Sequence, residues 1–249
     1  PLKHLLLFGD ASYDYKDQEE NNTNLVPIYQ SYNSYDAPFS YCSDDYYAIL
    51  DDNEGYWGIN SRDEGLDIGV GRLPVSNLAE ATIVVDKILH YHTEASLGDW
   101  IKRLTFVGDD EDLNSHVGPS ETITDLIQTQ RPSYNINKIW LDAYEQVSFG
   151  SGNRYPQANT DINKAINSQG TLIFNYVGHG GENGMAHEQV VTRPQIESWS
   201  NEDHLSFYIT ASCELAKIDN LEIESPGELM LLDPDGGAIG LVATTRVVY

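Results

Sequence analysis

Residues 171–181, TLIFNYVGHGG, and residues 205–214, LSFYITASCE, decide the fold class of this chain. Each is a short apolar run that stops abruptly at small or polar residues, as strands buried on both faces do. The runs at 104–107 and 238–243 repeat the pattern, and segments of helical periodicity separate the four. Strands of this kind that alternate with helices form a mainly parallel sheet, so we predict a three-layer α/β/α sandwich.

Helix start signals support this alternation. Asn77 with Glu80 and Ser225 with Glu228 have the spacing of capping boxes, and Pro226 suits a first helical turn. We therefore expect helices that begin near residues 78 and 226.

The pattern changes near Gly98. Before it, a tyrosine-rich polar stretch lies between the apolar run LLLF and the predicted strand LDIGVGRLP, whereas strands and helices alternate after it. The stretch ASLGDW interrupts the helical periodicity. We predict two subdomains, residues 1–97 and residues 98–249, with the first expected to lack its beginning, because the chain enters an apolar run directly after Pro1.

Composition excludes several classes of protein. The 14 basic and 39 acidic residues give a net charge of −25, which repels phosphate backbones, so we expect no nucleic-acid partner. The apolar runs are far shorter than the roughly 18 residues that suggest a membrane-spanning helix. Two cysteines allow neither a disulfide framework nor a four-cysteine zinc site.

The residues directly after the predicted strands carry reactive groups. In open parallel sheets, ligands bind at the carboxyl ends of the strands. His179 follows the strand at 172–177, Cys213 follows the strand at 205–211, and Asp109 and Asp110 follow the strand at 104–107. If these strands are neighbours, an imidazole, a thiol and a carboxylate converge at one edge of the sheet.

Such a set suits a cysteine nucleophile. A nearby histidine raises the thiolate fraction of Cys213 and can protonate a leaving amine. The backbone N–H groups of Gly180 and Cys213 are candidates for an oxyanion hole, and Asp109 or Asp110 is a candidate to orient His179. The structural alternative is a small buried cysteine and a turn histidine between glycines.

At these residues the sequence also resembles a known family. NYVGHGGENG and FYITASCE resemble the His-Gly and Ala-Cys blocks of the caspase and gingipain clan of cysteine peptidases, and within it the gingipain family. Similar blocks occur in order along nearly the whole chain: LLLFGDASYD, SDDYYAILDDNEG, LDIGVGRLPV, TFVGDDED and GGAIGLVATTRVVY. The chain is most similar to the PorU-type branch, the C-terminal signal peptidases or sortases of type IX secretion.

The resemblance implies a caspase-like, gingipain-type catalytic domain and a role for each site residue. Cys213 is the implied nucleophile, His179 the acid/base, and Asp110 the acidic residue near the histidine, with Asp109 as its alternative. Gingipains also carry an acid in the specificity pocket. The corresponding stretch, LNSHVGPSE, is shorter here. The acid of the specificity pocket cannot be matched to Glu121 or to any other residue, so no preference for Arg or Lys is predicted.

The resemblance also implies substrates, partners and a location. PorU-type enzymes remove a C-terminal sorting domain from secreted cargo, and a thioester on Cys213 permits transfer of the new carboxyl end to an amine on lipopolysaccharide. Other type IX secretion components are implied partners, at the outer face of the bacterial outer membrane. Two alternatives remain: a general secreted gingipain-like protease, and a catalytically silent, calcium-stabilised scaffold of the secretion machinery.

Metal sites are a separate question. Gingipain-type domains bind calcium, and one acidic stretch supplies candidate oxygen ligands, although it lacks the EF-hand order and a solvated loop is the alternative. These candidates are Asp44, Asp45, Asp51, Asp52 and Glu54. The spacing of His90, His92, His116 and His187 predicts no zinc site. Cys42 lies away from the strand end that faces His179, and we expect it to be structural or idle.

Overall fold

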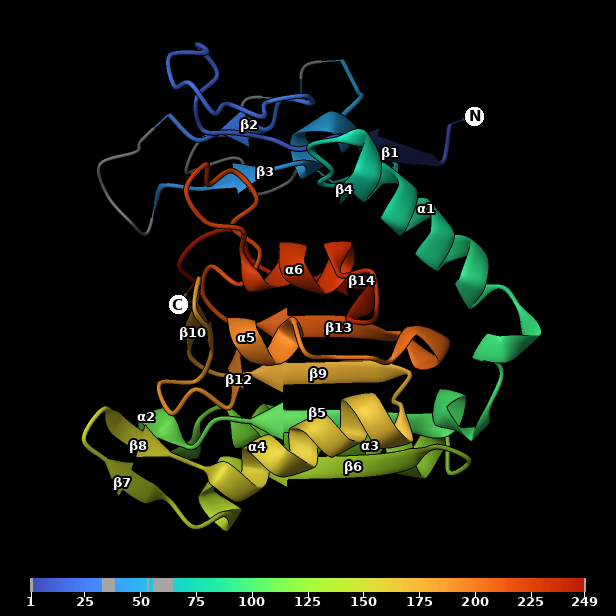
Figure 1. Ribbon diagram of the computed structural model, residues 1–249, viewed down its shortest axis with the longest axis vertical. Helices are drawn as coiled ribbons and strands as arrows, with labels where there is room; N and C mark the ends of the chain where they lie inside the picture. Colours follow the sequence, from blue (N-terminus) through green and yellow to red (C-terminus); the bar gives the residue numbers. More distant parts are fainter. Residues whose placement is uncertain (1, 33–38, 53, 56–64, 249) are drawn as a thin grey trace.

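The computed structural model describes residues 2–32, 39–52, 54–55 and 65–248. Its centre is a five-stranded sheet with the order β14-β13-β9-β5-β6 (Figure 1). The strands are β5 (Arg103–Gly108), β6 (Asn135–Trp140), β9 (Ile173–Val177), β13 (Ser206–Ala211) and β14 (Ala238–Val242). Every neighbouring pair in this sheet is parallel, as the sequence predicts.

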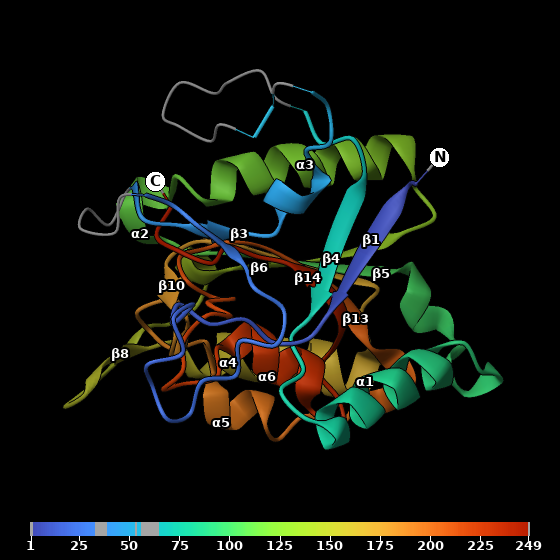
Figure 2. The ribbon, with the colours of Figure 1, turned by 90° about the horizontal axis from the view of Figure 1, so that it is seen from above.

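Helices cover both faces of this sheet. In Figure 2, α3 (Val117–Gln130) lies on one side, and α1 (Leu78–Tyr91), α4 (Pro156–Asn163) and α6 (Pro226–Leu232) lie on the other. The short helix α5 (Arg193–Ile196) packs against α6. The predicted three-layer α/β/α sandwich is therefore confirmed.

Large aromatic side chains fill the space between the sheet and the α4–α6 layer. Phe174 and Tyr208, on the neighbouring strands β9 and β13, are fully buried with ring centroids 5.1 Å apart, and Trp199 stacks on Tyr208 at 6.1 Å. Burial of one such side chain contributes about 1.5–3 kcal/mol. This packing fixes β9 and β13 relative to each other, and so fixes the loops that leave their carboxyl ends.

Both predicted helix starts form at the expected positions, and α6 has the full capping box, whereas at α1 the Glu80 carboxylate accepts the N–H of Ser76 instead of that of Asn77. The Asn77 side chain accepts the Glu80 N–H at 3.0 Å at the start of α1. At the start of α6, the Ser225 N–H donates to the Glu228 carboxylate at 2.7 Å. These bonds satisfy backbone N–H groups that a helix start otherwise leaves free.

The first part of the chain forms two small sheets at one end of the molecule (Figure 1). In one, β1 (His4–Phe8) pairs in parallel with β4 (Gly69–Leu73); in the other, β2 (Tyr29–Gln30) pairs antiparallel with β3 (Cys42–Ser43). Leu6 and Phe8 on β1 are 59% and 45% exposed. One face of β1 is thus left uncovered within the described residues.

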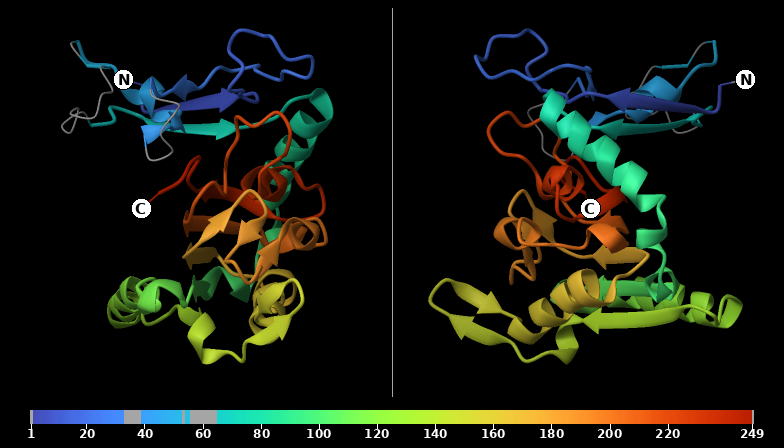
Figure 3. Two further views of the ribbon diagram at one scale, coloured as in Figure 1. Left: turned by 90° about the vertical axis from the view of Figure 1, so that its left-hand side faces the viewer. Right: turned by 45° about the vertical axis from the view of Figure 1, so that its right-hand side comes forward.

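The two parts of the chain are held together by packing as well as by the chain itself. Helix α1 descends from the β1–β4 sheet to the five-stranded sheet (Figure 3), and Lys87 on it donates to the carbonyls of Met230 and Leu231 at 3.2 and 2.9 Å. Burial lowers the pKa of Lys87 to about 8. Arg246 pairs with the buried Asp219, which also accepts a bond from Gln30 in β2. The boundary near Gly98 stays a prediction.

Short elements complete the chain. They are η2 (Asp45–Ala48), η3 (Glu94–Ser96), η4 (Asp99–Lys102), α2 (Glu111–Asn114), η5 (Leu141–Ala143), β7 (Val147–Phe149), β8 (Gly152–Arg154), η6 (Lys164–Gln169), β10 (Gly180–Gly181), β11 (Gly184–Met185), β12 (Val191–Thr192) and η7 (Glu202–His204). Within the described parts of the chain, no helix has both the length and the apolar character needed to cross a bilayer.

Candidate active site

Two neighbouring strands deliver His179 and Cys213 to the same edge of the sheet. Val177 at the end of β9 is in register with Ala211 at the end of β13, and the two side chains each come two residues later. Gly108 at the end of β5 is in register with Val177 on the other side, so Asp109 follows at the same level. The three strands are therefore neighbours, which is the condition for the predicted convergence of an imidazole, a thiol and a carboxylate.

The loops that carry the histidine and the cysteine touch directly. A Cβ atom on Gly180 would lie 2.1 Å from Ser212 Oγ, closer than any side chain allows. The residue after His179 therefore packs against the residue before Cys213, and a side chain at position 180 would displace the Ser212 hydroxyl.

The backbone of His179 is anchored on both sides. Its N–H donates to Asp109 Oδ2 at 2.9 Å, and its carbonyl accepts the Tyr176 hydroxyl at 2.5 Å and the Ala186 N–H at 2.8 Å. Burial raises the pKa of Tyr176 well above its ordinary value, so its hydroxyl remains a donor. Asp109 thus positions the backbone of the histidine.

The imidazole contacts Asp112 rather than the predicted Asp110. His179 Nε2 lies 2.9 Å from Asp112 Oδ2 and 3.5 Å from Glu111 Oε2. Asp110 Oδ2 instead accepts the Tyr155 hydroxyl at 2.7 Å, and Tyr155 stays protonated because burial and this carboxylate raise its pKa. The prediction that Asp110 orients the imidazole is therefore wrong, and Asp112 is the carboxylate that contacts it.

An unusual turn brings Asp112 to the histidine. Asp112, Leu113 and Asn114 in α2 have φ angles of 54°, 60° and 61°, a left-handed run without glycine. The left-handed conformation costs a residue with a Cβ atom roughly 1–2 kcal/mol. Sequence patterns gave no signal for it, because glycine is the usual marker of such backbone. Strain of this kind is concentrated at functional sites.

The two cysteines have different environments. Cys213 is half-buried, its Sγ lies 3.5 Å from Val248 O, and the next residue, Glu214, has a left-handed φ of 50°. Cys42 is 2% exposed, and burial together with the nearby Asp219 carboxylate raises its pKa to about 12. Cys42 is therefore a structural thiol, as expected, and Cys213 is the accessible one.

These contacts set the protonation state that a thiol requires. With Asp112 on Nε2, the neutral imidazole carries its proton on that nitrogen and its lone pair on Nδ1. The Gly180 N–H makes no hydrogen bond within its own hairpin. The Ala186 N–H bonds the His179 carbonyl, so Gly180 and Met185 lie opposite each other as a non-hydrogen-bonded pair of the β10–β11 ladder. It remains a candidate oxyanion donor.

The predicted calcium ligands are not gathered around a common point. Asp44 forms a two-pronged ion pair with Arg72 at 2.6 and 2.8 Å, and Glu54 accepts the Asp51 N–H at 3.2 Å. Within the residues that the structure describes, no group of three metal-binding side chains includes any of the five candidates. Arg72 already neutralises the Asp44 carboxylate, and calcium binding by this stretch stays a prediction.

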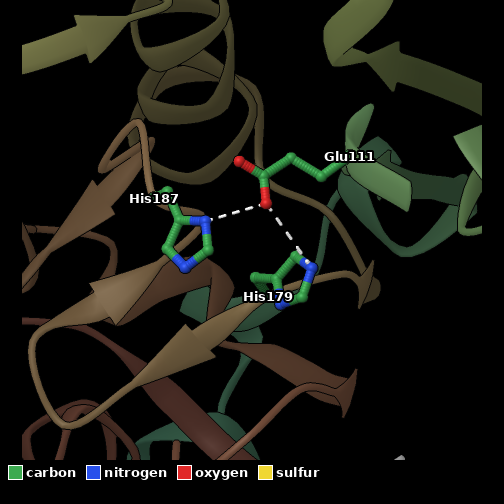
Figure 4. Close-up of side chains that lie close together, drawn as sticks. All are labelled: Glu111, His179 and His187. Carbon is green, nitrogen blue, oxygen red and sulfur yellow. Dashed lines mark hydrogen bonds and ion pairs between the residues drawn. The ribbon is translucent and has the colours of Figure 1, made fainter. Parts of the chain in front are cut away.

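The structure groups other potential ligands that sequence spacing did not. Glu111, His179 and His187 form one group (Figure 4), Asp112, His116 and His179 a second, and Asp109, Asp110 and Glu188 a third. His187 stacks on His179 with centroids 4.9 Å apart, and its pKa is raised by its hydrogen bond to Glu111. Loops far apart in sequence supply each group, so no spacing motif could reveal them.

Comparison with known proteins agrees with this geometry. The model of the family described as "Peptidase family C25" matches residues 1–249. None of the curated proteins matches the sequence.

Solved gingipain structures share the fold. The Arg-specific cysteine proteinase gingipain R superposes with a TM-score of 0.69 at 18% identity, over 100% of this chain and 50% of that chain. The complex of the Porphyromonas gingivalis RgpB pro- and mature domains gives 0.67 at 19% identity, over 98% and 50%. A structure described as "Structure of Protease" gives 0.69 at 20% identity, over 99% and 46%. The chain therefore spans about half the length of these proteins.

Proposed function

Because the chain belongs to peptidase family C25 and is by family a cysteine-type peptidase, we propose that Cys213 and His179 cleave peptide bonds through a thioester. The observation that carries this proposal is the register of β9 and β13, which places both side chains two residues beyond the same rung of the sheet. The burial of Cys42 leaves Cys213 as the available nucleophile.

The contacts around His179 suggest an order of events. Nδ1 takes the proton of Cys213, and the thiolate attacks the substrate carbonyl carbon. The N–H groups of Gly180 and Cys213 face the developing oxyanion, where each donor is typically worth about 2.7–4 kcal/mol. The imidazolium then gives its proton to the leaving amine, and Asp112 stabilises its charge throughout.

The thioester has two possible acceptors. Water, deprotonated by His179, releases a free carboxylate and restores the thiol, which is hydrolysis. An amine in its place forms a new amide bond and likewise restores the thiol, which is transpeptidation.

Paired cysteine variants test the nucleophile. Cys213→Ala should abolish cleavage, whereas Cys42→Ala should retain most of it, because a thiol with a pKa of about 12 is not the attacking group. The measurement is cleavage of a peptide library and of candidate cargo, with both variants checked for folding by circular dichroism. Equal activity of the two variants would refute the proposal.

Thiol labelling provides a test without substrate. At neutral pH an alkylating reagent should modify Cys213 in the folded protein and reach Cys42 only after unfolding. Unreactive Cys213, together with absent cleavage, would favour the catalytically silent scaffold.

As substrates, we propose secreted proteins that carry a C-terminal sorting domain. This proposal is supported by the ordered sequence blocks shared with the PorU-type branch, from LLLFGDASYD to GGAIGLVATTRVVY. With these substrates we also propose an amine on lipopolysaccharide as the acceptor, other type IX secretion components as partners, and the outer face of the outer membrane as the location.

A substrate comparison separates this role from general proteolysis. The domain should cut cargo before its sorting domain and leave unrelated denatured proteins intact. Mass spectrometry should show the new carboxyl end joined to an added amine. Degradation of the denatured proteins at a similar rate would favour the general gingipain-like protease instead.

For the expected calcium ion, we propose the group Asp109, Asp110 and Glu188 in place of the acidic stretch at 44–54. One oxygen of each lies within 4.8 Å of the others, and oxygen ligands suit calcium. Glu188 is 6% exposed, and both Glu188 Oε2 and Asp110 Oδ1 lack a hydrogen-bond partner. Burial and then the neighbouring carboxylates raise the pKa of Glu188, a cost that a cation would relieve.

Thermal unfolding tests this placement. Saturating calcium should raise the melting temperature above that in chelator by roughly 5–10 °C, the effect of ligand at about 100 times Kd on a domain of this size. Glu188→Gln should remove most of the difference, and Asp52→Asn should leave it unchanged. The placement fails if Glu188→Gln keeps the full calcium effect.

A further inference from the structure

A cluster of metal-binding side chains surrounds the outer nitrogen of the candidate catalytic histidine. His179 Nε2 lies 3.5 Å from Glu111 Oε2, which lies 2.8 Å from His187 Nδ1, and all three atoms are within 4.8 Å of one another (Figure 4). Asp112 Oδ2 approaches the same Nε2 atom at 2.9 Å. The cluster therefore contains two imidazole nitrogens and one carboxylate, and Asp112 lies next to it, in a second group with His116 and His179.

We propose that this cluster is an inhibitory zinc site in which Glu111, His179 and His187 bind Zn²⁺ and Asp112 supplies the fourth ligand. Two histidines with a carboxylate are an established zinc donor set. Ligand atoms about 2.1 Å from a tetrahedral zinc ion lie roughly 3.4 Å from one another. Two separations within the cluster are close to that value: 3.5 Å from His179 Nε2 to Glu111 Oε2, and 2.8 Å from Glu111 Oε2 to His187 Nδ1. The rings of His179 and His187 stack within 14° of parallel, so one ring must rotate for both nitrogens to face the ion.

A neighbouring histidine supports the fourth ligand. His116 Nε2 is shielded from solvent, lacks a hydrogen-bond partner and lies 3.5 Å from Asp112 Oδ2. A group that contacts a metal ligand from outside orients it and raises its affinity for the metal. His116 is placed to do this for Asp112.

The ligand chemistry favours zinc over calcium or magnesium. Imidazole nitrogen suits zinc and other late transition metals, whereas calcium and magnesium take oxygen ligands almost exclusively. The net charge of −25 also attracts cations to the surface of the protein.

Zinc on Nε2 would block the proposed chemistry. The metal occupies the Nε2 lone pair, so the single proton of the neutral imidazole must lie on Nδ1. Nδ1 then cannot accept the proton of Cys213, and the thiolate does not form by that route. This inhibitory effect rests on the proposed function, whereas binding of the ion does not.

Calorimetry with zinc chloride tests binding alone. The protein used carries Cys213→Ala, which removes the thiol as a ligand. We expect one zinc ion per chain, and His187→Ala in this background should weaken binding at least tenfold, since loss of even an outer-shell partner costs about 10–100-fold. His92→Ala, at an exposed histidine that caps the C-terminal end of α1, is the matched control and should leave the affinity unchanged. Absent binding, or equal affinity with and without His187, overturns the site.

Activity measurements test inhibition. The parent chain and His187→Ala, both with Cys213 intact, are assayed for cleavage at increasing zinc concentrations. Each rate is divided by the zinc-free rate of the same protein, so a change in basal activity does not affect the comparison. The half-inhibiting concentration should rise at least about tenfold in His187→Ala, in line with the loss of one ligand. Equal sensitivity of the two proteins would show that zinc acts elsewhere, for example at the thiol. If no cleavage occurs at all, the proposed function fails, and the calorimetry still decides the site.

Discussion

At His179, different carboxylates control the backbone and the ring. Asp109 accepts the backbone N–H, whereas Asp112 lies on ring Nε2 at 2.9 Å. A carboxylate beside ring Nε2, as Asp112 is, keeps the proton of the neutral ring on Nε2 and stabilises the imidazolium. Asp110, bonded to Tyr155, can contribute only through the packing of its own loop.

Asparagine substitutions of Asp112 and of Asp110 should therefore differ in their effect on kcat. Asp112→Asn should lower kcat by about 10²-fold, the lower end of general acid–base contributions, because an amide N–H on Nε2 favours the wrong tautomer. It should also alter the pH profile of kcat/KM, which a purely structural defect would not do. Asp110→Asn should lower kcat much less; a larger loss there than at position 112 would contradict this assignment.

At the scale of an element, the capping box of α6 contains a buried carboxylate. Glu228 is buried and accepts hydrogen bonds from the N–H and the hydroxyl of Ser225. Burial raises the pKa of Glu228 to about 8, although the bonds from Ser225 lower it. Between an unfolded value near 4.3 and this value, the folded chain binds more protons than the unfolded chain. The free energy of unfolding from this group therefore falls as pH rises through that window.

Glu228→Gln isolates this contribution. The amide keeps an oxygen acceptor for Ser225 and cannot ionise, so the variant should lose part of the decline in stability between about pH 5 and 8. It should be more stable than the parent chain at pH 8 and closer to it at pH 5. Urea unfolding at several pH values measures the difference, and parallel curves for the two proteins would contradict the prediction.

At the scale of the whole molecule, Arg72 ties the first part of the chain together. Its side chain is 3% exposed, pairs with Asp44 at 2.6 Å and donates to the carbonyls of Gly9 and Val26 at 2.7 Å. This buried guanidinium provides the positive charge that we expected calcium to supply beside Asp44. The stretch after β1 and the stretch before η2 are both held to β4 in this way.

Removal of this cation should destabilise the protein. Arg72→Met leaves the partly buried Asp44 without a counter-charge, and loss of one partner of a fully buried pair, about 3–5 kcal/mol, is the upper bound of the cost. The double variant Arg72→Met/Asp44→Leu should recover a substantial part of that loss, because no unpaired charge remains. Thermal and denaturant unfolding of the three proteins measure both effects; an additive double variant would show that the ion pair is not coupled.

By itself, the sequence determined the parallel sheet, the helix starts and the positions of His179 and Cys213 just after two strands. Each depends on short-range pattern, since apolar runs, capping residues and the residue after a strand are all read within a few positions. Only the tertiary structure decided which acid faces the imidazole, since a left-handed turn without glycine carries Asp112 past Asp110. It alone brought His187 and Glu111 to His179 and Arg72 to Asp44, because such contacts arise from packing of distant loops and leave no spacing in the chain.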